Sequence, residues 1–514
     1  MLSSAPLNSA VPKSAPWRAA GFLAVAAIFV YLQTFVLGDV PVLGTADQSI
    51  YLLNSRRMLE GQVIYRDFFQ FTPPGTETLY WMLFKLWGVR AWIPEGALLG
   101  LGVALTWLSI VISRRLMRDA SVYLAGLLFL AFPFQAALDG THHWYSTLAA
   151  MASLAVLIDS RSARRLIAAG GLCGVSAWFT QSRGLAVLIG LAAFLIWERR
   201  HTRQAWTSLI RNCASLLGGF LAAIVVLNGY FAWKVGLRQF WYCIAVFGTK
   251  YYTSDEINTW RTYGTSVPSI HGWYQSPDLL IWLSVHVLVP LVYILFLVRF
   301  WRETARRPEQ PWDKLMLVNF VGLFLFLGVA AAPSYLRLCT VALPALILLV
   351  WFVNWPGMPE RILRGLCWAV AIGLMTIEPA HVQRHWRATL DLATGRQAFL
   401  YPEDYDTCRW FLVHAQPSDY LFGDPFINFA LGLRAPAQID FVRPSDYTRP
   451  EQVQRLMDDL ERTRTRWVIW TAYLGPPNPA QDHLGPLLVY LRRRYRVAGV
   501  LPDSGQILER YDSR

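Results

Sequence analysis

The sequence has little charge for its length. Only 16% of its 514 residues are Asp, Glu, Lys or Arg, whereas soluble domains carry about 25%. The six cysteines lie mostly in apolar runs, without the spacing of a disulfide framework or a metal site. We interpret them as small buried side chains. The shortage of charge excludes a chain built only of soluble domains.

Several motifs are missing as well. The sequence has no glycine-rich nucleotide fingerprint, no phosphate-binding loop and no Ser-His-Asp set identifiable by spacing, which disfavours a nucleotide-sugar donor. The first apolar run, from about Ala19 to Leu37, lacks a small-x-small cleavage site and is predicted to be a span rather than a signal peptide. Lys and Arg outnumber Asp and Glu by 47 to 34 but cluster between apolar runs, unlike a nucleic-acid-binding face.

What the sequence does contain is apolar residues, at 54%, gathered into runs long enough to cross a bilayer. We expect a polytopic α-helical membrane protein with about eleven transmembrane helices. The runs begin near Ala19, Glu95, Ser121, Trp144, Leu166, Leu185, Cys213, Leu279, Leu315, Leu338 and Ile362.

Basic residues mark every second loop between these runs, which places those loops in the cytoplasm. Arginines follow the second, fourth, sixth, eighth and tenth runs, and Lys13 and Arg18 precede the first. The N-terminus is therefore predicted inside, and an odd number of spans puts the C-terminal segment outside. We divide the chain into a membrane domain, 1–380, with a first outer loop at 38–94, and an extracytoplasmic α/β domain, 381–514. In the latter we predict strands at 420–424, 466–473 and 505–510 and helices at 451–463 and around 487–495.

The first outer loop carries two predicted interfacial helices. Apolar residues between Asp47 and Leu59 follow a helical period, and Gly61 can end that helix. A rigid Pro-Pro-Gly turn comes next, and an aromatic-rich helix is expected from Thr76 to Trp87.

The first outer loop carries the string Asp47-x-x-x-Tyr51, Gly61-x-x-x-Tyr65-Arg66-Asp67 and Pro73-Pro74-Gly75. With these residues it resembles the first periplasmic loop of the GT-C glycosyltransferases. These are polyprenyl-phosphate-sugar-dependent membrane enzymes, such as the protein O-mannosyltransferases and the lipid A aminoarabinose transferases. The resemblance implies an inverting sugar transfer with Asp47 as the acceptor-side catalytic residue. Many relatives carry Asp-Glu where this chain has Asp47-Gln48.

The chemistry of sugar transfer independently favours a catalytic role for Asp47. An acceptor hydroxyl that attacks a lipid-linked sugar needs a carboxylate to take its proton, and the departing phosphate needs Arg or Lys donors. The alternative for Asp47 is a helix N-cap, a position that Asp favours.

A short outer loop between the third and fourth spans adds Asp139, His142 and His143. We expect Asp139 to be an auxiliary catalytic acid, and the histidines, with Tyr51, to contact acceptor or donor. A divalent metal is the alternative role for the histidines, but no further ligand motif accompanies them, so we expect neither a metal nor another cofactor.

The remaining candidates are cationic or aromatic. Arg183, Arg337 and Tyr335 lie at the outer ends of spans and are predicted to bind the donor phosphate, whereas arginines there can also reach for lipid headgroups. Lys250 lies in a polar, aromatic outer loop that can close over a substrate.

We therefore predict a glycosyltransferase that moves a hexose or pentose from a polyprenyl-phosphate sugar to a lipid, polysaccharide or protein acceptor outside the cytoplasm. The location expected is a bacterial inner membrane. A transporter or flippase is the alternative, but the two halves of the chain do not resemble each other and charged residues are almost absent from the span centres. A catalytically inactive relative that acts as a scaffold is a third interpretation.

Overall fold

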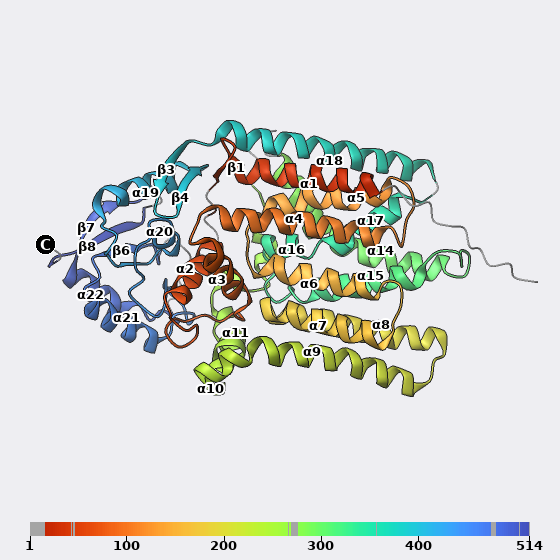
Figure 1. The fold of residues 1–514 in the computed structure, drawn as a ribbon, viewed down its shortest axis with the longest axis horizontal. Coiled ribbons are helices and arrows are strands. Elements are labelled where there is room, and N and C mark those ends of the chain that lie inside the picture. Colours follow the sequence, from red (N-terminus) through yellow and green to blue (C-terminus); the bar gives the residue numbers. More distant parts are fainter. Residues whose placement is uncertain are drawn as a thin grey trace, which may run out of the picture.

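The computed structural model describes residues 16–42, 44, 47–265, 267–268, 276–355, 357–473, 480–502 and 504–512. Most of them are helical. The longer helices run side by side in one bundle, and the C-terminal domain covers one end of it (Figure 1). Two short helices of the first outer loop lie between these two parts.

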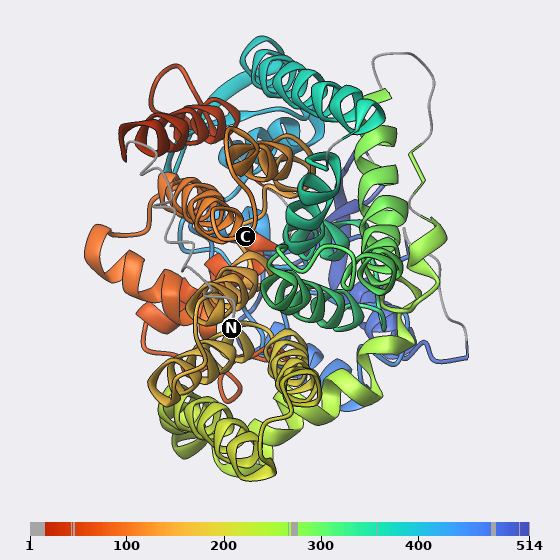
Figure 2. The same cartoon turned by 90° about the vertical axis from the view of Figure 1, so that its right-hand side faces the viewer.

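Each of the eleven predicted apolar runs contains a helix. Six helices or helical segments are long and apolar enough to cross a membrane, and the total number of spans stays a prediction. Figure 2 shows the bundle turned by 90°, with most helices viewed close to end-on. The helices are α1 (Pro16–Thr34), α4 (Trp92–Ser113), α5 (Ser121–Phe129), α6 (His142–Leu157), α7 (Ala163–Phe179), α8 (Gln181–Thr202), α9 (Trp206–Val235), α13 (Ser276–Leu283) with α14 (Val289–Glu303), α15 (Trp312–Leu327), α16 (Tyr335–Thr340) with α17 (Leu343–Val353), and α18 (Met358–His385).

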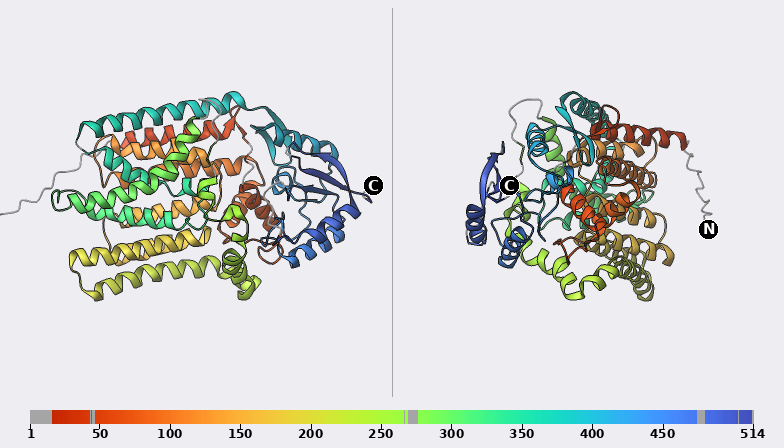
Figure 3. Two further views of the ribbon diagram at one scale, coloured as in Figure 1. Left: turned by 180° about the vertical axis from the view of Figure 1, so that it is seen from behind. Right: turned by 60° about the vertical axis from the view of Figure 1, so that its left-hand side comes forward.

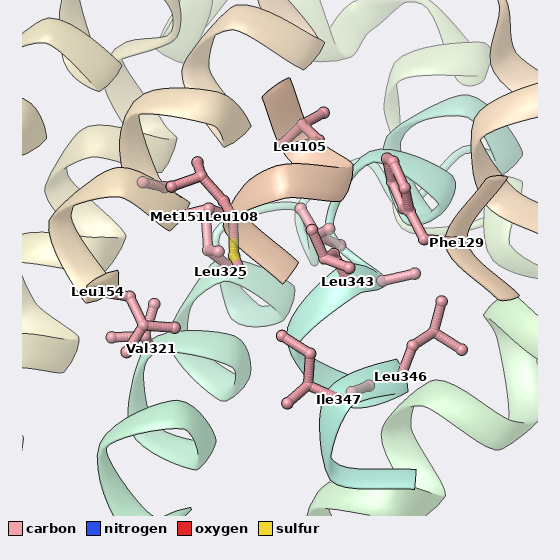
Figure 4. Close-up of a cluster of buried hydrophobic side chains, with 14 of the residues drawn as sticks. Leu105, Leu108, Phe129, Met151, Leu154, Val321, Leu325, Leu343, Leu346 and Ile347 are labelled. Carbon is pink, nitrogen blue, oxygen red and sulfur yellow. The ribbon is translucent and has the colours of Figure 1, made fainter. Parts of the chain in front are cut away.

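The bundle is held by close apolar packing. Figure 4 shows leucine, methionine and phenylalanine side chains from several of these helices meeting in one buried cluster. Helices α7 and α9 approach most closely at glycines. A Cβ on Gly170 would overlap the carbonyl oxygen of Leu216, and one on Gly219 would overlap that of Ile167. Small residues at such crossings let two backbones touch, as is common between membrane helices.

The first outer loop folds as predicted around two helices. After the short strands β1 (Phe35–Val36) and β2 (Val40–Pro41), α2 spans Gln48–Leu59 and α3 spans Gly75–Trp87. Gly61, with φ of +92°, follows the end of α2. A second outer segment crosses the same region through α10 (Leu237–Trp241), the π-helical turn Tyr242–Phe247, α11 (Gly248–Lys250) and the 3₁₀ turns Tyr252–Ser254 and Glu256–Asn258.

The C-terminal domain is α/β. Its four-stranded sheet has the order β5-β6-β8-β7, with β5 (Leu421–Phe422) parallel to β6 (Trp467–Trp470) and the other pairs antiparallel. Strand β8 (Gln506–Arg510) and helices α21 (Pro450–Arg462) and α22 (Gly485–Arg494) lie where the sequence predicts them. Helix α20 (Pro425–Ala430) follows β5, and the sequence did not predict the hairpin β3 (Ala388–Leu392) and β4 (Gly395–Phe399), α19 (Pro402–His414) or β7 (Tyr495–Val500). Figure 3 shows that this domain joins the bundle at the C-terminal end of α18.

Candidate functional site

A cavity of about 950 Å³ lies where the bundle, the first outer loop, the 241–258 segment and the C-terminal domain meet. Six of the nine residues predicted from the sequence line it: Asp47, Tyr51, His142, His143, Arg183 and Arg337. They come from α2, α6, α8 and α16, so the fold brings together positions almost 300 residues apart in the chain.

Asp47 stands immediately before α2 and faces this cavity. Its backbone carbonyl accepts a hydrogen bond from the Ile50 N–H at 3.1 Å, but its side chain makes no capping bond. The N-cap interpretation therefore does not explain the residue. Although Asp47 is exposed to the cavity, the surrounding protein desolvates its carboxyl and raises its pKa above the ordinary value, against the lowering effects of Arg337 and Arg443. A raised pKa makes the ionised carboxylate a stronger base.

Tyr51 and the two histidines form a neighbouring polar group. The Tyr51 hydroxyl lies 2.6 Å from His142 Nδ1, which links α2 to the first turn of α6. The His142 and His143 rings lie side by side, with centroids 3.9 Å apart. All three residues are buried against the cavity wall. Together they offer a surface that can hydrogen-bond to hydroxyl groups.

Asp139 lies behind this wall rather than in the cavity lining. Its side chain is buried beside the Gln48 backbone N–H and the Thr141 side chain, whose hydrogen bonds oppose part of the effect of burial on its pKa. Burial, and secondarily the charge of Asp47, raises the pKa of Asp139 well above its usual range. The turn that carries it is fixed by Gln48 Oε1, which accepts from the Gly140 N–H at 2.5 Å, and by the Tyr80 hydroxyl, which donates to the Gly140 carbonyl at 2.6 Å.

Arg183 is almost completely buried. Its guanidinium donates to Ser146 Oγ at 3.3 Å, Thr147 Oγ1 at 3.2 Å and Thr340 Oγ1 at 2.6 Å, and also to the His143 carbonyl. These bonds tie α8 to α6 and α16. Arg183 therefore supports the cavity wall and brings positive charge to it, with most of its donors already used.

Arg337 is more accessible. It donates to the Ala332 carbonyl at 2.8 Å, to Asn258 Oδ1 at 3.2 Å and to the Tyr252 hydroxyl. Two other predicted residues, Tyr335 and Lys250, lie outside the cavity lining. The Tyr335 ring is parallel to that of His286, with centroids 6.2 Å apart. The Lys250 ammonium lies 5.1 Å from the centroid of the Tyr251 ring.

The C-terminal domain supplies part of the wall that the sequence did not predict. Its segment 439–448 contributes Asp440, Arg443 and Tyr447 to the lining. The segment is held by Arg57 of α2, whose Nη1 lies 2.9 Å from Asp440 Oδ1 and whose Nη2 donates to the Ala437 carbonyl at 2.9 Å. The only sequence signal is that Arg57 stands within a predicted amphipathic helix beside apolar residues.

Metal binding is the alternative that the sequence leaves open for His142 and His143. Within the described ranges, no group of three or more His, Cys, Asp or Glu side chains lies close enough to hold an ion. Adjacent histidines such as His142 and His143 are by themselves too few ligands for a typical protein site.

Comparison with known proteins gives a clear structural result. No protein-family model and no curated protein matches the sequence. Among solved structures, ArnT from Cupriavidus metallidurans bound to undecaprenyl phosphate superposes with a TM-score of 0.62 at 14% identity, over 97% of this chain and 99% of that one. Its apo form gives 0.58 at 14% identity, over 96% and 98%. The apo oligosaccharyltransferase of Archaeoglobus fulgidus gives 0.51 at 11% identity, over 88% and 69%. These likenesses show that the chain has the fold of ArnT, which is the GT-C fold that the resemblance of its first outer loop predicts.

Proposed function

We propose that this protein is an inverting glycosyltransferase that moves one hexose or pentose from a polyprenyl phosphate to an acceptor outside the cytoplasm. The GT-C fold supports this class of reaction. One neighbour with the same fold holds undecaprenyl phosphate, which supports a polyprenyl-phosphate-linked donor here. The acceptor is a hydroxyl-bearing lipid, polysaccharide or protein.

The observation that carries the proposal is the environment of Asp47. Its carboxylate faces a cavity large enough for a sugar and its phosphate, and its side chain makes no hydrogen bond or ion pair with another described residue. Arg337 lies on the same cavity, close enough for its charge to lower the pKa of Asp47. One base and one cation in a single enclosed space are what a transfer with a phosphate leaving group needs.

In the proposed step, the acceptor oxygen attacks the anomeric carbon of the donor as the bond from that carbon to the phosphate oxygen breaks. Asp47 takes the proton of the acceptor hydroxyl. The electron pair of the broken bond stays on the polyprenyl phosphate, whose added negative charge Arg337 stabilises. Attack from the face opposite the phosphate inverts the anomeric centre. Asp139, buried behind the cavity wall, is the auxiliary acid, and His142 and His143 bind substrate hydroxyls.

We place the reaction on the outer side of a bacterial inner membrane, with the N-terminus in the cytoplasm. This placement rests on the alternation of basic loops along the chain.

The test uses full-length protein in lipid nanodiscs with a panel of radiolabelled polyprenyl-phosphate sugars. Asp47→Asn should lower the rate of sugar release by a factor of about 10² to 10⁴, the usual contribution of a general base. Asp39→Asn is the matched control, because Asp39 lies in the exposed turn between β1 and β2. Equal turnover by folded Asp47→Asn and wild type would refute the role of Asp47, and binding of no donor by wild type would refute the proposed donor class.

A further inference from the structure

The cavity holds a second accessible arginine, and it comes from the C-terminal domain. The Arg443 side chain is 42% exposed, in contrast to the nearly buried Arg183. Its charge reaches Asp47, as that of Arg337 does. Two arginines from different parts of the chain thus act on the same carboxyl group.

One short segment orients both arginines. The consecutive 3₁₀ turns at 252–258 place Tyr252 and Asn258 against Arg337, and Asp255 between them against Arg443. The partners differ in charge, because Arg337 is held by neutral side chains and Arg443 by a carboxylate. The segment therefore brings the two guanidinium groups to one side of the cavity.

The contact between Arg443 and Asp255 is loose. The carboxylate Oδ2 lies 3.6 Å from Arg443 Nε, beyond normal hydrogen-bond length. The terminal nitrogens of Arg443 make no hydrogen bond with any residue in the described part of the chain. A guanidinium in this state keeps its fork of donors for a planar or tetrahedral anion.

The position of Arg443 is nevertheless well defined. Its own backbone N–H donates to Thr448 Oγ1 at 2.7 Å, and three residues earlier Asp440 is anchored to Arg57 by the buried ion pair. The backbone of the segment is thus fixed while the end of the side chain is accessible, which is the arrangement expected of a ligand-binding residue.

We propose that Arg443 is a second ligand of the lipid-linked phosphate, so that the C-terminal domain completes the phosphate site with Arg337. The inference rests on the proposed function and adds a residue to it. Asp255 is the internal partner that Arg443 exchanges for the phosphate. A single accessible cation would leave the charge that develops on the leaving phosphate only partly compensated, and a pair of arginines compensates it from two sides.

Binding of undecaprenyl phosphate to the full-length protein in nanodiscs tests this inference without turnover. Arg443→Gln should weaken binding by about 10- to 100-fold, the value of one charge-assisted hydrogen-bonding group. Arg443→Lys keeps the charge but not the fork and should fall between this variant and wild type. Arg434→Gln, an exposed arginine of the same domain that stacks on Tyr420, is the matched control and should bind as wild type does.

A variant that is expected not to weaken phosphate binding separates an effect on binding from an effect on folding. Asp255→Asn removes the competing carboxylate, so it should bind undecaprenyl phosphate at least as tightly as wild type. Weaker binding by this variant, or unchanged binding by Arg443→Gln, would overturn the inference. A wild-type protein that binds no undecaprenyl phosphate would instead refute the proposed donor class.

Discussion

The buried ion pair between Arg57 and Asp440 should decide whether the C-terminal domain stays over the cavity. Both side chains are about 95% buried, and the pair is 2.9 Å long. Arg57→Met preserves the stem of the side chain but leaves the Asp440 carboxylate buried without its cation. Removing one member of such a pair costs about 3–5 kcal/mol. The docked state should lose roughly 200- to 4,000-fold in population relative to open states.

The double variant Arg57→Met/Asp440→Leu gives the sharper comparison. It removes both charges, and an apolar replacement of a buried pair is often close to neutral. The lost hydrogen bond to the Ala437 carbonyl should still cost about 1–3 kcal/mol. The double variant should therefore be more stable than Arg57→Met alone, although one more side chain has been changed.

Hydrogen exchange of the backbone amides in α2 and in residues 437–448 measures this docking in nanodiscs. The matched control is Arg66→Met, which breaks the exposed pair of Arg66 with Asp67 and should leave exchange unchanged. Equal protection in Arg57→Met and wild type, or a double variant less protected than Arg57→Met, would refute the reasoning.

Three further predictions concern stability and pH. Gly219→Ala in α9 should destabilise the bundle by about 1–3 kcal/mol because the new Cβ overlaps the Ile167 carbonyl. Gly218→Ala, at a position with open space around it, should leave stability unchanged. Thermal unfolding in nanodiscs compares the two variants. Burial raises the pKa of Glu77 to about 8. Between pH 4.5 and about 8 the folded protein therefore keeps a proton that the unfolded chain has lost. The free energy of unfolding should fall as pH rises across this range. Glu77→Gln should flatten that part of the melting-temperature profile, and identical profiles would contradict the assignment. Because Asp47 must be ionised to act as a base, sugar transfer should increase with pH through its raised pKa, and a rate that falls over that range would argue against this role.

The sequence was sufficient to predict the helical frame, because apolar runs of span length have few other stable structures. It also identified α2 and α3 from apolar periodicity and a Pro-Pro-Gly turn. Asp47 could be chosen from the resemblance of the first outer loop, and Arg337 as a cation at the outer end of a predicted span. Their convergence on one cavity needed the tertiary structure.

The features that the sequence did not predict have separate physical causes. Strand β7 begins at Tyr495, the residue after α22 ends, so no turn residue separates the two. The contribution of Arg443 depends on how a separate domain packs on the first outer loop, and no local motif encodes that packing. The buried ion pair of Arg57 was not predicted either, because a cation within an amphipathic helix normally indicates a side that faces water or lipid headgroups.

Gln48 shows how packing explains a departure from the family pattern. This residue follows Asp47 where many relatives carry Glu. Its side chain is 2% exposed, accepts a hydrogen bond from the Gly140 N–H and also hydrogen-bonds to the Glu95 carboxyl. An ionised glutamate in its place could accept from the Gly140 N–H but could not donate to the Glu95 carboxyl. The amide both donates and accepts, so the two buried acids Glu95 and Asp139 can remain beside α2. The amide at position 48 therefore fits the way this cavity wall is packed, and Asp47 is the carboxylate that the first outer loop contributes to the cavity lining.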